Sequence, residues 1–292
     1  MRVFLMLERG ILMADSSPDV LSRKYEERYV AFIDILGFRE LIKSSLEKSD
    51  TFDILILSLK RIANFTLKDP LLVNNPPDLK AQNFSDNIVI SAHLSANGLW
   101  HLLIAISDLF WSLSQFGVLL RGGVSRGPLY HDENIVFGPA LVDAHHLQQN
   151  VAVFPRVVLS RQVYVDAEQY AQLHSMWDTY FSSRLIRADD GPAFLHVLLN
   201  LQAFNHSGRS KSSPNAETHP IFESGNNFCR TLRNSLAANM DKPSVYTKLK
   251  WFAEYFDREV VARKEPDESF FEPFFPKPAG THAPCRLPFR HI

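Results

Sequence analysis

The order of strand-like and helix-like segments after Tyr29 constrains the fold of this chain more than any other feature. The β-branched and aromatic run 29–33 predicts a buried strand, and two stretches with helical spacing follow it, at 38–48 and 51–65. Two short strand-like pieces then turn around 85–87, as in a β-hairpin. The later segments predict, in order, a helix at 98–117, a strand, a Gly/Asp turn and a returning strand within 118–138, a helix at 139–150, a strand at 156–160, a helix from Ser160 to His174 and a strand within 193–201. This order predicts an α/β fold, specifically an α+β sandwich in which helices cover one face of an antiparallel-rich sheet.

The composition is typical of a soluble globular protein, since 46% of the 292 residues are hydrophobic and 22% are charged. The formal net charge of -1 gives no general attraction to nucleic acid or to a membrane surface, so we expect neither as a partner. The apolar N-terminal run contains Glu8 and Arg9, which the core of a secretory signal would exclude, and the chain has only two cysteines. These features predict a cytoplasmic protein without a disulfide framework.

Composition shifts along the chain suggest five parts. We expect a flexible leader at 1–27, a main domain at 28–205, a polar linker at 206–220, a C-terminal helical extension at 221–266 and a Pro-rich tail at 267–292. The extension is expected to contain an amphipathic helix within 244–264.

Two acids lie where strands end, and this is an unusual place for a carboxylate. Asp34 follows the apolar run 29–33, and Asp86 lies at the tip of the predicted hairpin. Taken singly, each has an ordinary explanation, as a helix cap or as a turn residue. If the first strand and the hairpin are neighbours, both carboxylates reach one edge of the sheet, where together they suit a hard cation such as Mg²⁺ or Mn²⁺.

The short loop after Asp34 has the features of an anion site. Gly37 allows the backbone N–H groups of the loop to converge, and the predicted helix begins directly after it. A divalent cation beside an anion-binding turn implies a phosphorylated substrate.

Four motifs in this order resemble the catalytic domain of class III nucleotidyl cyclases. They are "FIDILGF", "FSDNIVI", "LLRGGVSRG" and "FGPALVDAHHL", and they span about residues 28 to 165. With "FPRVVLS", the last two look closest to the bacterial pyrimidine cyclases of anti-phage signalling, which make cyclic UMP or cyclic CMP. The resemblance implies a ferredoxin-like cyclase domain at 28–205.

The resemblance also implies the roles of particular residues. Asp34, Asp86 and the Ile35 carbonyl would hold two divalent ions, Mn²⁺ or Mg²⁺, and the backbone N–H groups of Gly37, Phe38 and Arg39 would cradle the β and γ phosphates. Such enzymes are homodimers with shared active sites. The partner subunit would supply helix residues of the region from Asp143 to His146.

This sequence departs from the family at the positions that stabilise the transition state. Many of these cyclases have an Asn and, four residues later, an Arg on the helix after the glycine, whereas this chain has Val142 and His146. The candidate replacements are Asp143, His145, His146, Arg121, Arg126 and Arg156.

A second departure concerns the base. Where adenylate cyclases tend to place a Lys and an Asp or Thr, this chain has Gln82 and Ile135, which speaks against ATP. An amide both donates and accepts hydrogen bonds, so Gln82 matches uracil or cytosine, and it is equally explained as an exposed strand residue. Family resemblance alone favours UTP over CTP.

We therefore predict a uridylate cyclase that makes cyclic UMP and pyrophosphate in anti-phage defence, functionally linked to an effector that binds the cyclic nucleotide. The alternatives are a cytidylate or adenylate cyclase of the same fold, and a non-catalytic module that uses the fold for dimerisation or nucleotide sensing. A dinucleotide cyclase is disfavoured, because the hairpin lacks the Gly-Gly-acid-Glu-Phe turn of that group.

Overall fold

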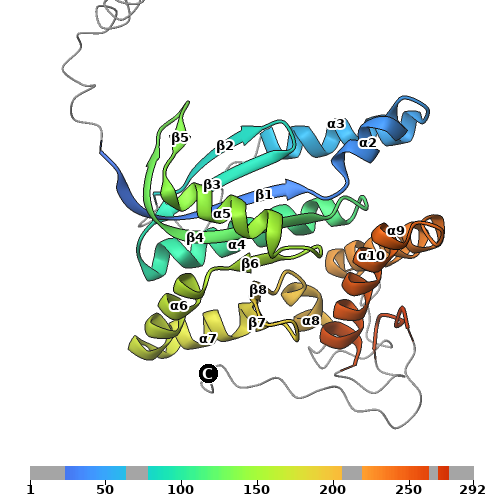
Figure 1. Ribbon diagram of the computed structural model, residues 1–292. Helices are drawn as coiled ribbons and strands as arrows, with labels where there is room; N and C mark the ends of the chain where they lie inside the picture. The colour runs from blue at the N-terminus through green and yellow to red at the C-terminus, as the bar shows by residue number, and fades with distance from the viewer. Residues whose placement is uncertain (1–23, 64–77, 206–218, 263–268, 276–292) are drawn as a thin grey trace, which may run out of the picture.

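The computed structural model describes residues 24–63, 78–205, 219–262 and 269–275. One eight-stranded sheet runs through it in the order β2-β3-β1-β4-β6-β8-β7, and β5 pairs with β4 (Figure 1). The strands are β1 (Glu26–Ile35), β2 (Lys80–Phe84), β3 (Asn87–His93), β4 (Leu120–His131), β5 (Val136–Phe137), β6 (Val157–Leu159), β7 (Leu185–Arg187) and β8 (Ala193–Leu195). The helices are α2 (Phe38–Ser45), α3 (Ser49–Ala63), α4 (Ala96–Ser114), α5 (Pro139–Asn150), α6 (Arg161–Leu173), α7 (Ser175–Arg184), α8 (Leu199–Asn205), α9 (Pro220–Ala238), α10 (Pro243–Phe256) and a π-helical turn (Asp257–Val261).

The first half of the chain has the ferredoxin-like arrangement. β1 lies between β3 and β4 and is antiparallel to both, while β2 is antiparallel to β3 on the outer edge. With α2 and α3 between β1 and β2 and α4 between β3 and β4, the chain follows the β-α-β-β-α-β order, and β3 lies between β1 and β2 in the sheet. The predicted α/β fold class, with an antiparallel-rich sheet covered by helices, is confirmed.

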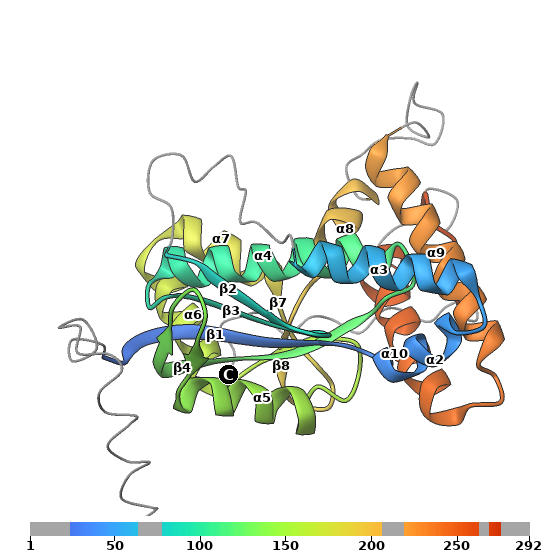
Figure 2. The same cartoon turned by 90° about the horizontal axis from the view of Figure 1, so that it is seen from above.

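Helices cover both faces of this sheet, not one as the sequence suggested. Along β1, Tyr29, Ala31 and Ile33 belong to the core that includes α4, whereas Val30 and Phe32 pack with residues of α5. Figure 2 shows α4 and α5 on opposite sides of the strands. Burial on both faces explains why this strand is apolar almost throughout.

β4 continues through its glycines and does not turn at them. A Cβ atom on Gly123 would collide with the backbone oxygen of Ala144 and would lie 2.5 Å from the Cβ of Leu147. The glycine therefore lets α5 lie directly on the strand. The turn comes later, where Asp132 Oδ1 accepts hydrogen bonds from the backbone N–H groups of Asn134 at 2.9 Å and Ile135 at 2.7 Å.

The second half of the sheet differs more from the prediction. β6 is parallel to β4, and β8 and β7 extend the sheet beyond it. The strand predicted within 193–201 ends at Leu195, because the chain enters α8 at Leu199. α7 and β7 had no sequence prediction. Ser160 does cap α6, since its side chain accepts a hydrogen bond from the backbone N–H of Val163.

The C-terminal helices share the core of the sheet. Phe228 of α9 and Phe252 of α10 are fully buried in the same cluster as the residues of α4. Arg156, which is 2% exposed, lies over the ring of Trp251 and so joins the end of β6 to α10. The predicted linker lies almost wholly outside the described residues.

The described part of the predicted Pro-rich tail is packed against the protein. Phe270 and Phe271 are buried, and the backbone N–H groups of Phe274 and Phe275 donate to the Asp257 carboxylate at 2.7 and 2.8 Å. None of the described helices combines the length and apolar character that crossing a membrane requires.

Candidate metal- and phosphate-binding site

The ladder between β1 and β3 brings the two predicted acids together. Asp34 lies opposite Asn87, the residue after Asp86, and the backbone N–H of Ile35 donates to the backbone oxygen of Asp86 at 3.2 Å. Burial raises the pKa of the Asp34 carboxyl, and the neighbouring Asp86 carboxylate raises it further, while Arg121 acts in the opposite direction. The juxtaposition of these acids on one sheet edge agrees with the sequence prediction.

Two residues that the sequence did not place here hold the Asp34 carboxylate. Arg121, opposite Asp34 in the β1–β4 ladder, donates from Nε and from Nη2 to Asp34 Oδ2, each at 3.0 Å. Gln148 of α5, which is 2% exposed, donates from Nε2 to the same oxygen at 2.8 Å. The sequence suggests Arg121 only as a transition-state residue. Gln148 follows Ala140 and Ala144 at four-residue spacing on the buried side of α5. A polar residue at such a position is the sequence feature that indicates a buried polar partner such as Asp34.

The donor chemistry of this edge fits a hard divalent cation. Two carboxylates and adjacent backbone carbonyls are the oxygen ligands that Mg²⁺ and Mn²⁺ use. Within the described segments no group of three or more His, Cys, Asp or Glu side chains gathers as a metal site. Asp34 and Asp86 would therefore have to share the ion with backbone, substrate and water, as is usual for Mg²⁺.

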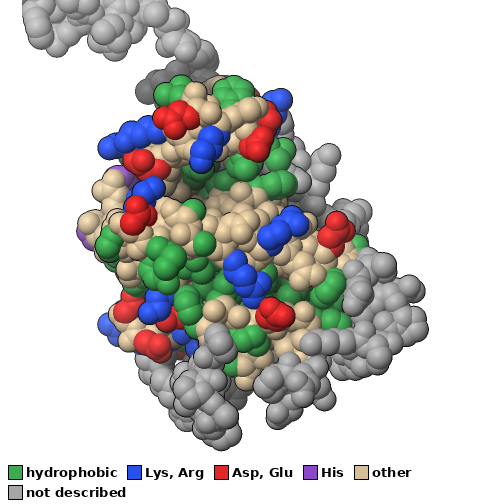
Figure 3. Space-filling view, turned by 90° about the vertical axis from the view of Figure 1, so that its right-hand side faces the viewer, with side chains coloured by type: hydrophobic (Ala, Val, Ile, Leu, Met, Phe, Trp, Pro, Cys, Tyr) green, Lys and Arg blue, Asp and Glu red, His purple; other side chains and the backbone are tan. Residues whose placement is uncertain are grey.

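The turn after β1 begins a helix at the same edge. Gly37 is the N-cap of α2, with φ 78°, a left-handed conformation that favours glycine, and the space around its missing Cβ is open. Its carbonyl accepts from Glu40 and Leu41, so the N–H groups of Phe38 and Arg39 belong to the first turn, where no intrahelical acceptor exists. Figure 3 views the molecule from the side on which α2 lies, and lysine and arginine side chains are scattered there among acidic ones.

Gln82, the residue expected to read the base, contacts the turn that contains Ile135. Gln82 of β2 donates from Nε2 to the backbone oxygen of Asn134, which precedes Ile135. Within the described structure, the Gln82 Oε1 atom is buried and has no hydrogen-bond partner. Residues 52 positions apart in sequence are thus in contact at the β4–β5 turn.

The remaining predicted residues are on the outer side of α5. Asp143 and His146 are exposed, and so is Val142. The single chain does not bring them to Asp34 and Asp86. Their assignment to the active site of a partner subunit stays a prediction.

Two of the arginines considered as transition-state residues have other partners. Arg126 donates from Nη1 to both oxygens of Asp166 at 2.9 Å. Arg156 forms a two-point ion pair with Asp190. Both guanidinium groups are therefore engaged away from the acidic pair.

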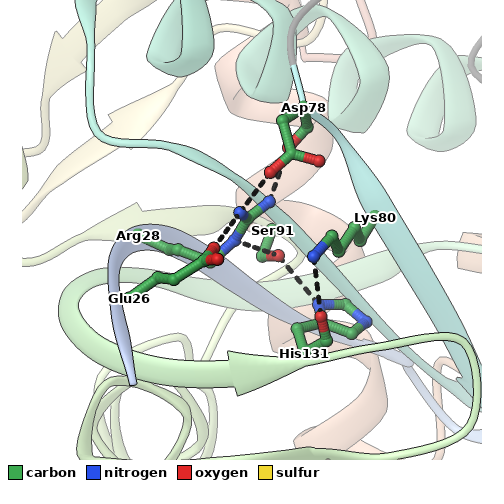
Figure 4. Close-up of polar contacts among 6 residues, drawn as sticks. All are labelled: Glu26, Arg28, Asp78, Lys80, Ser91 and His131. Carbon is green, nitrogen blue, oxygen red and sulfur yellow. Dashed lines mark hydrogen bonds and ion pairs between the residues drawn. The ribbon is translucent and has the colours of Figure 1, made fainter. Parts of the chain in front are cut away.

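A second polar cluster lies toward the opposite end of β1 (Figure 4). Arg28 is fully buried, donates from Nε to Ser91 Oγ at 3.0 Å and forms ion pairs with Glu26 and Asp78. Ser91 Oγ lies 2.8 Å from Nδ1 of His131. The ring of His131 is buried on β4, so this cluster ties β1, β3 and β4 together.

Burial and the nearby cations change the acidity of the histidine in this cluster. Desolvation lowers the pKa of His131 to about 4, with Arg28 and Lys80 acting in the same direction and Asp132 and Asp78 against it. The ring is therefore neutral at physiological pH. We interpret the cluster as structural, because hydrogen bonds and ion pairs join Arg28, Ser91 and the Nδ1 side of His131 across three neighbouring strands.

Comparisons with known proteins establish no family. No family model matches the sequence, and no curated protein matches it. A solved structure of a bacterial light-regulated adenylyl cyclase has a TM-score of 0.37 and 12% identity, covering 56% of this chain and 53% of that one. A class III adenylyl cyclase-like ATP-binding protein from Pseudomonas aeruginosa has a TM-score of 0.35 and 12% identity, covering 52% of this chain and 38% of that one. The chain thus spans about half the length of the first of these proteins and less than half the length of the second.

Proposed function

We propose that this protein is a nucleotidyl cyclase that converts UTP to 3′,5′-cyclic UMP and pyrophosphate. The observation that carries the proposal is that Asp34 and Asp86 lie beside each other where β1 ends, close to the left-handed Gly37 at the start of α2. Two carboxylates beside a helix N-terminus provide sites for a divalent cation and for phosphate at one sheet edge. The ferredoxin-like order of β1 to β4 supports this proposal, because it sets the end of β1 beside the start of β3.

The reaction requires the ribose 3′-oxygen to attack the α-phosphorus while the bond to the pyrophosphate oxygen breaks. The 3′-hydroxyl proton is released, and the products are the cyclic nucleotide and pyrophosphate. Divalent ions bound at Asp34 and Asp86 would supply charge stabilisation at the attacking oxygen and the phosphates. The chain itself aligns the substrate: the N–H groups of Gly37, Phe38 and Arg39 bind the β and γ phosphates.

The proposed pyrimidine preference rests on Gln82. Its Nε2 is bonded to the backbone oxygen of Asn134, and its Oε1 is the buried acceptor without a partner among the described residues. An acceptor in that place suits the N3–H of uracil, and it also suits the amino group of cytosine. We propose UTP over CTP, and a role in anti-phage signalling, on the resemblance of the sequence motifs.

The proposed enzyme is a cytoplasmic homodimer whose two active sites are each shared between subunits. The exposed residues Val142, Asp143 and His146 of α5 support this arrangement, because a partner can reach them. The proposed product would act on a separate effector that binds cyclic nucleotides.

The test is to incubate the purified protein with Mn²⁺ and each of the four nucleoside triphosphates, and to identify the cyclic products by mass spectrometry. We expect cyclic UMP and pyrophosphate in equal amounts. Asp34→Asn and Asp86→Asn should each reduce turnover about 100- to 1000-fold, because charge stabilisation at the metal site is lost. Asp53→Asn, an exposed residue of α3, is the matched control and should retain full activity. Product from ATP alone would refute the pyrimidine proposal.

A second candidate function is a non-catalytic nucleotide-sensing or dimerisation module. Its specific support is that Arg121 and Gln148 already satisfy Asp34 Oδ2 in the isolated chain. A protein that binds UTP with Mn²⁺ but yields no cyclic nucleotide from any triphosphate would favour this candidate.

A further inference from the structure

Asp34 Oδ2 is the most heavily hydrogen-bonded atom of the proposed metal site. Arg121 Nε and Nη2 each lie 3.0 Å from it, and Gln148 Nε2 lies 2.8 Å from it. A carboxylate oxygen has about two lone pairs, so three donors leave that oxygen no free lone pair for a cation. An ion that uses Oδ2 must first displace a donor.

The two donor residues differ in how readily they can move. Gln148 is 2% exposed and sits on the side of α5 that lies against β4. The Arg121 side chain is 25% exposed, at the accessible end of the pair. Its guanidinium also carries the positive charge that opposes a divalent cation. Arg121 is therefore the donor that a cation would displace, and Gln148 the one that would stay to orient the carboxylate.

The backbone of Arg121 lies near the turn proposed to bind phosphate. The N–H of Leu36, the residue before Gly37, donates to the backbone oxygen of Leu119 at 2.8 Å. Leu119 comes two residues before Arg121, directly before β4 begins. A guanidinium released from Asp34 would therefore lie beside the triphosphate, and a planar cation with five N–H donors binds phosphate oxygens well.

We propose that Arg121 is an internal counter-ion of the metal site, which a divalent cation displaces from Asp34 and which then binds the nucleotide triphosphate. This inference rests on the proposed function and adds a regulatory step to it. The cation alone binds weakly, because Arg121 competes with it for Asp34. The cation and the nucleotide bind cooperatively, because the triphosphate provides a new partner for the displaced guanidinium. Arg121 thereby takes the place of the arginine that His146 replaces on α5.

The experiment measures Mn²⁺ binding by calorimetry with and without 3′-deoxyuridine triphosphate, which lacks the attacking hydroxyl. Without nucleotide, Arg121→Gln should bind Mn²⁺ about tenfold more tightly than the unmodified protein, because the competing charge is gone. With 3′-deoxyuridine triphosphate, the same variant should bind the Mn²⁺ complex about tenfold more weakly. Arg121→Lys keeps the charge, so its Mn²⁺ affinity should fall between those of the unmodified protein and Arg121→Gln.

Arg126→Gln is the matched control, because Arg126 is on the same strand, its side chain is 27% exposed and it is ion-paired to Asp166. This variant should bind Mn²⁺ like the unmodified protein. Equal or weaker Mn²⁺ binding by Arg121→Gln, with its circular dichroism spectrum unchanged, would overturn the counter-ion role and leave the proposed function standing. Absence of Mn²⁺ binding by every one of these proteins, both without and with 3′-deoxyuridine triphosphate, would instead refute the metal site, and with it the proposed function.

Discussion

The buried histidine of the Arg28 cluster should make the stability of the fold depend on pH. His131 is 5% exposed, and its Nε2 atom has no hydrogen-bond partner within the described structure. Its pKa falls to about 4, whereas an ordinary histidine titrates near 6.5. Below that ordinary value the unfolded chain binds a proton that the folded chain does not, so acid favours unfolding. The stability is complete above about pH 6.5 and is lost as the pH falls toward about 4.

The size of the effect follows from these two pKa values. The folded state should lose about 2 kcal/mol at pH 5 and about 3 kcal/mol at pH 4 relative to neutral pH. The matching variant is His131→Asn, whose amide can keep the hydrogen bond to Ser91 without titrating. His93→Asn, an exposed histidine at the end of β3, is the control.

Urea unfolding followed by circular dichroism at pH 7 and pH 5 provides the measurement. The unmodified protein and His93→Asn should lose about 2 kcal/mol more than His131→Asn over this interval. A cavity left by the shorter side chain lowers stability equally at both pH values and so cancels in the comparison. If His131→Asn showed the same loss on acidification as the unmodified protein, the assignment of a neutral buried imidazole would be wrong.

Three further predictions concern the site and its support. Gly37→Ala should lower the free energy of unfolding by about 1 kcal/mol, since an L residue is strained at positive φ, and should weaken triphosphate binding in a calorimetric titration. Gly123→Ala should cost more, about 2 to 3 kcal/mol in urea unfolding, because the added methyl group pushes α5 off β4; a loss no larger than that of Gly37→Ala would contradict the close packing. Gln148→Leu should leave the fold intact and reduce cyclic UMP formation about tenfold through a misoriented Asp34, and unchanged turnover would show that Gln148 is not needed to orient the carboxylate.

The first half of the fold could be predicted well because its signals are local. The strand before Asp34, the turn at Gly37 and the hairpin at 85–87 are each marked by residue types that allow few alternatives. α4 and α5 likewise appeared at the expected positions. The arrangement of the two acids followed from assuming that the first strand lies beside the hairpin, and it does so through β3.

The second half could not be predicted as well, for physical reasons. β7 was missed because its three residues are too few to show an alternation of polar and apolar positions. The strand predicted within 193–201 is shortened to the three residues of β8. The glycines of β4 suggested a turn, but Gly123 is required because α5 packs directly on the strand there. That contact is between distant parts of the chain, so the local sequence does not reveal it.

The donors to Asp34 were missed for a related reason. The pairing with Arg121 depends on strand register, and the contact of Gln148 depends on how α5 lies across the sheet. Neither contact can be predicted from spacing along the chain, because each depends on which residues of another element lie opposite.

The ladders on both sides of β1 have a consequence for how this sequence can change. Asp34 faces Asn87 on one side and Arg121 on the other, so the same backbone bonds fix both the fold and the position of the acid. A single inserted or deleted residue in β1 would turn every following side chain to the opposite face. Asp34 would then point toward the α4 core and Ile33 or Ile35 toward the acidic edge. Length variation among descendants of this sequence is therefore expected in the loops, whereas the distance along the chain from Arg28 to Gly37 should stay constant.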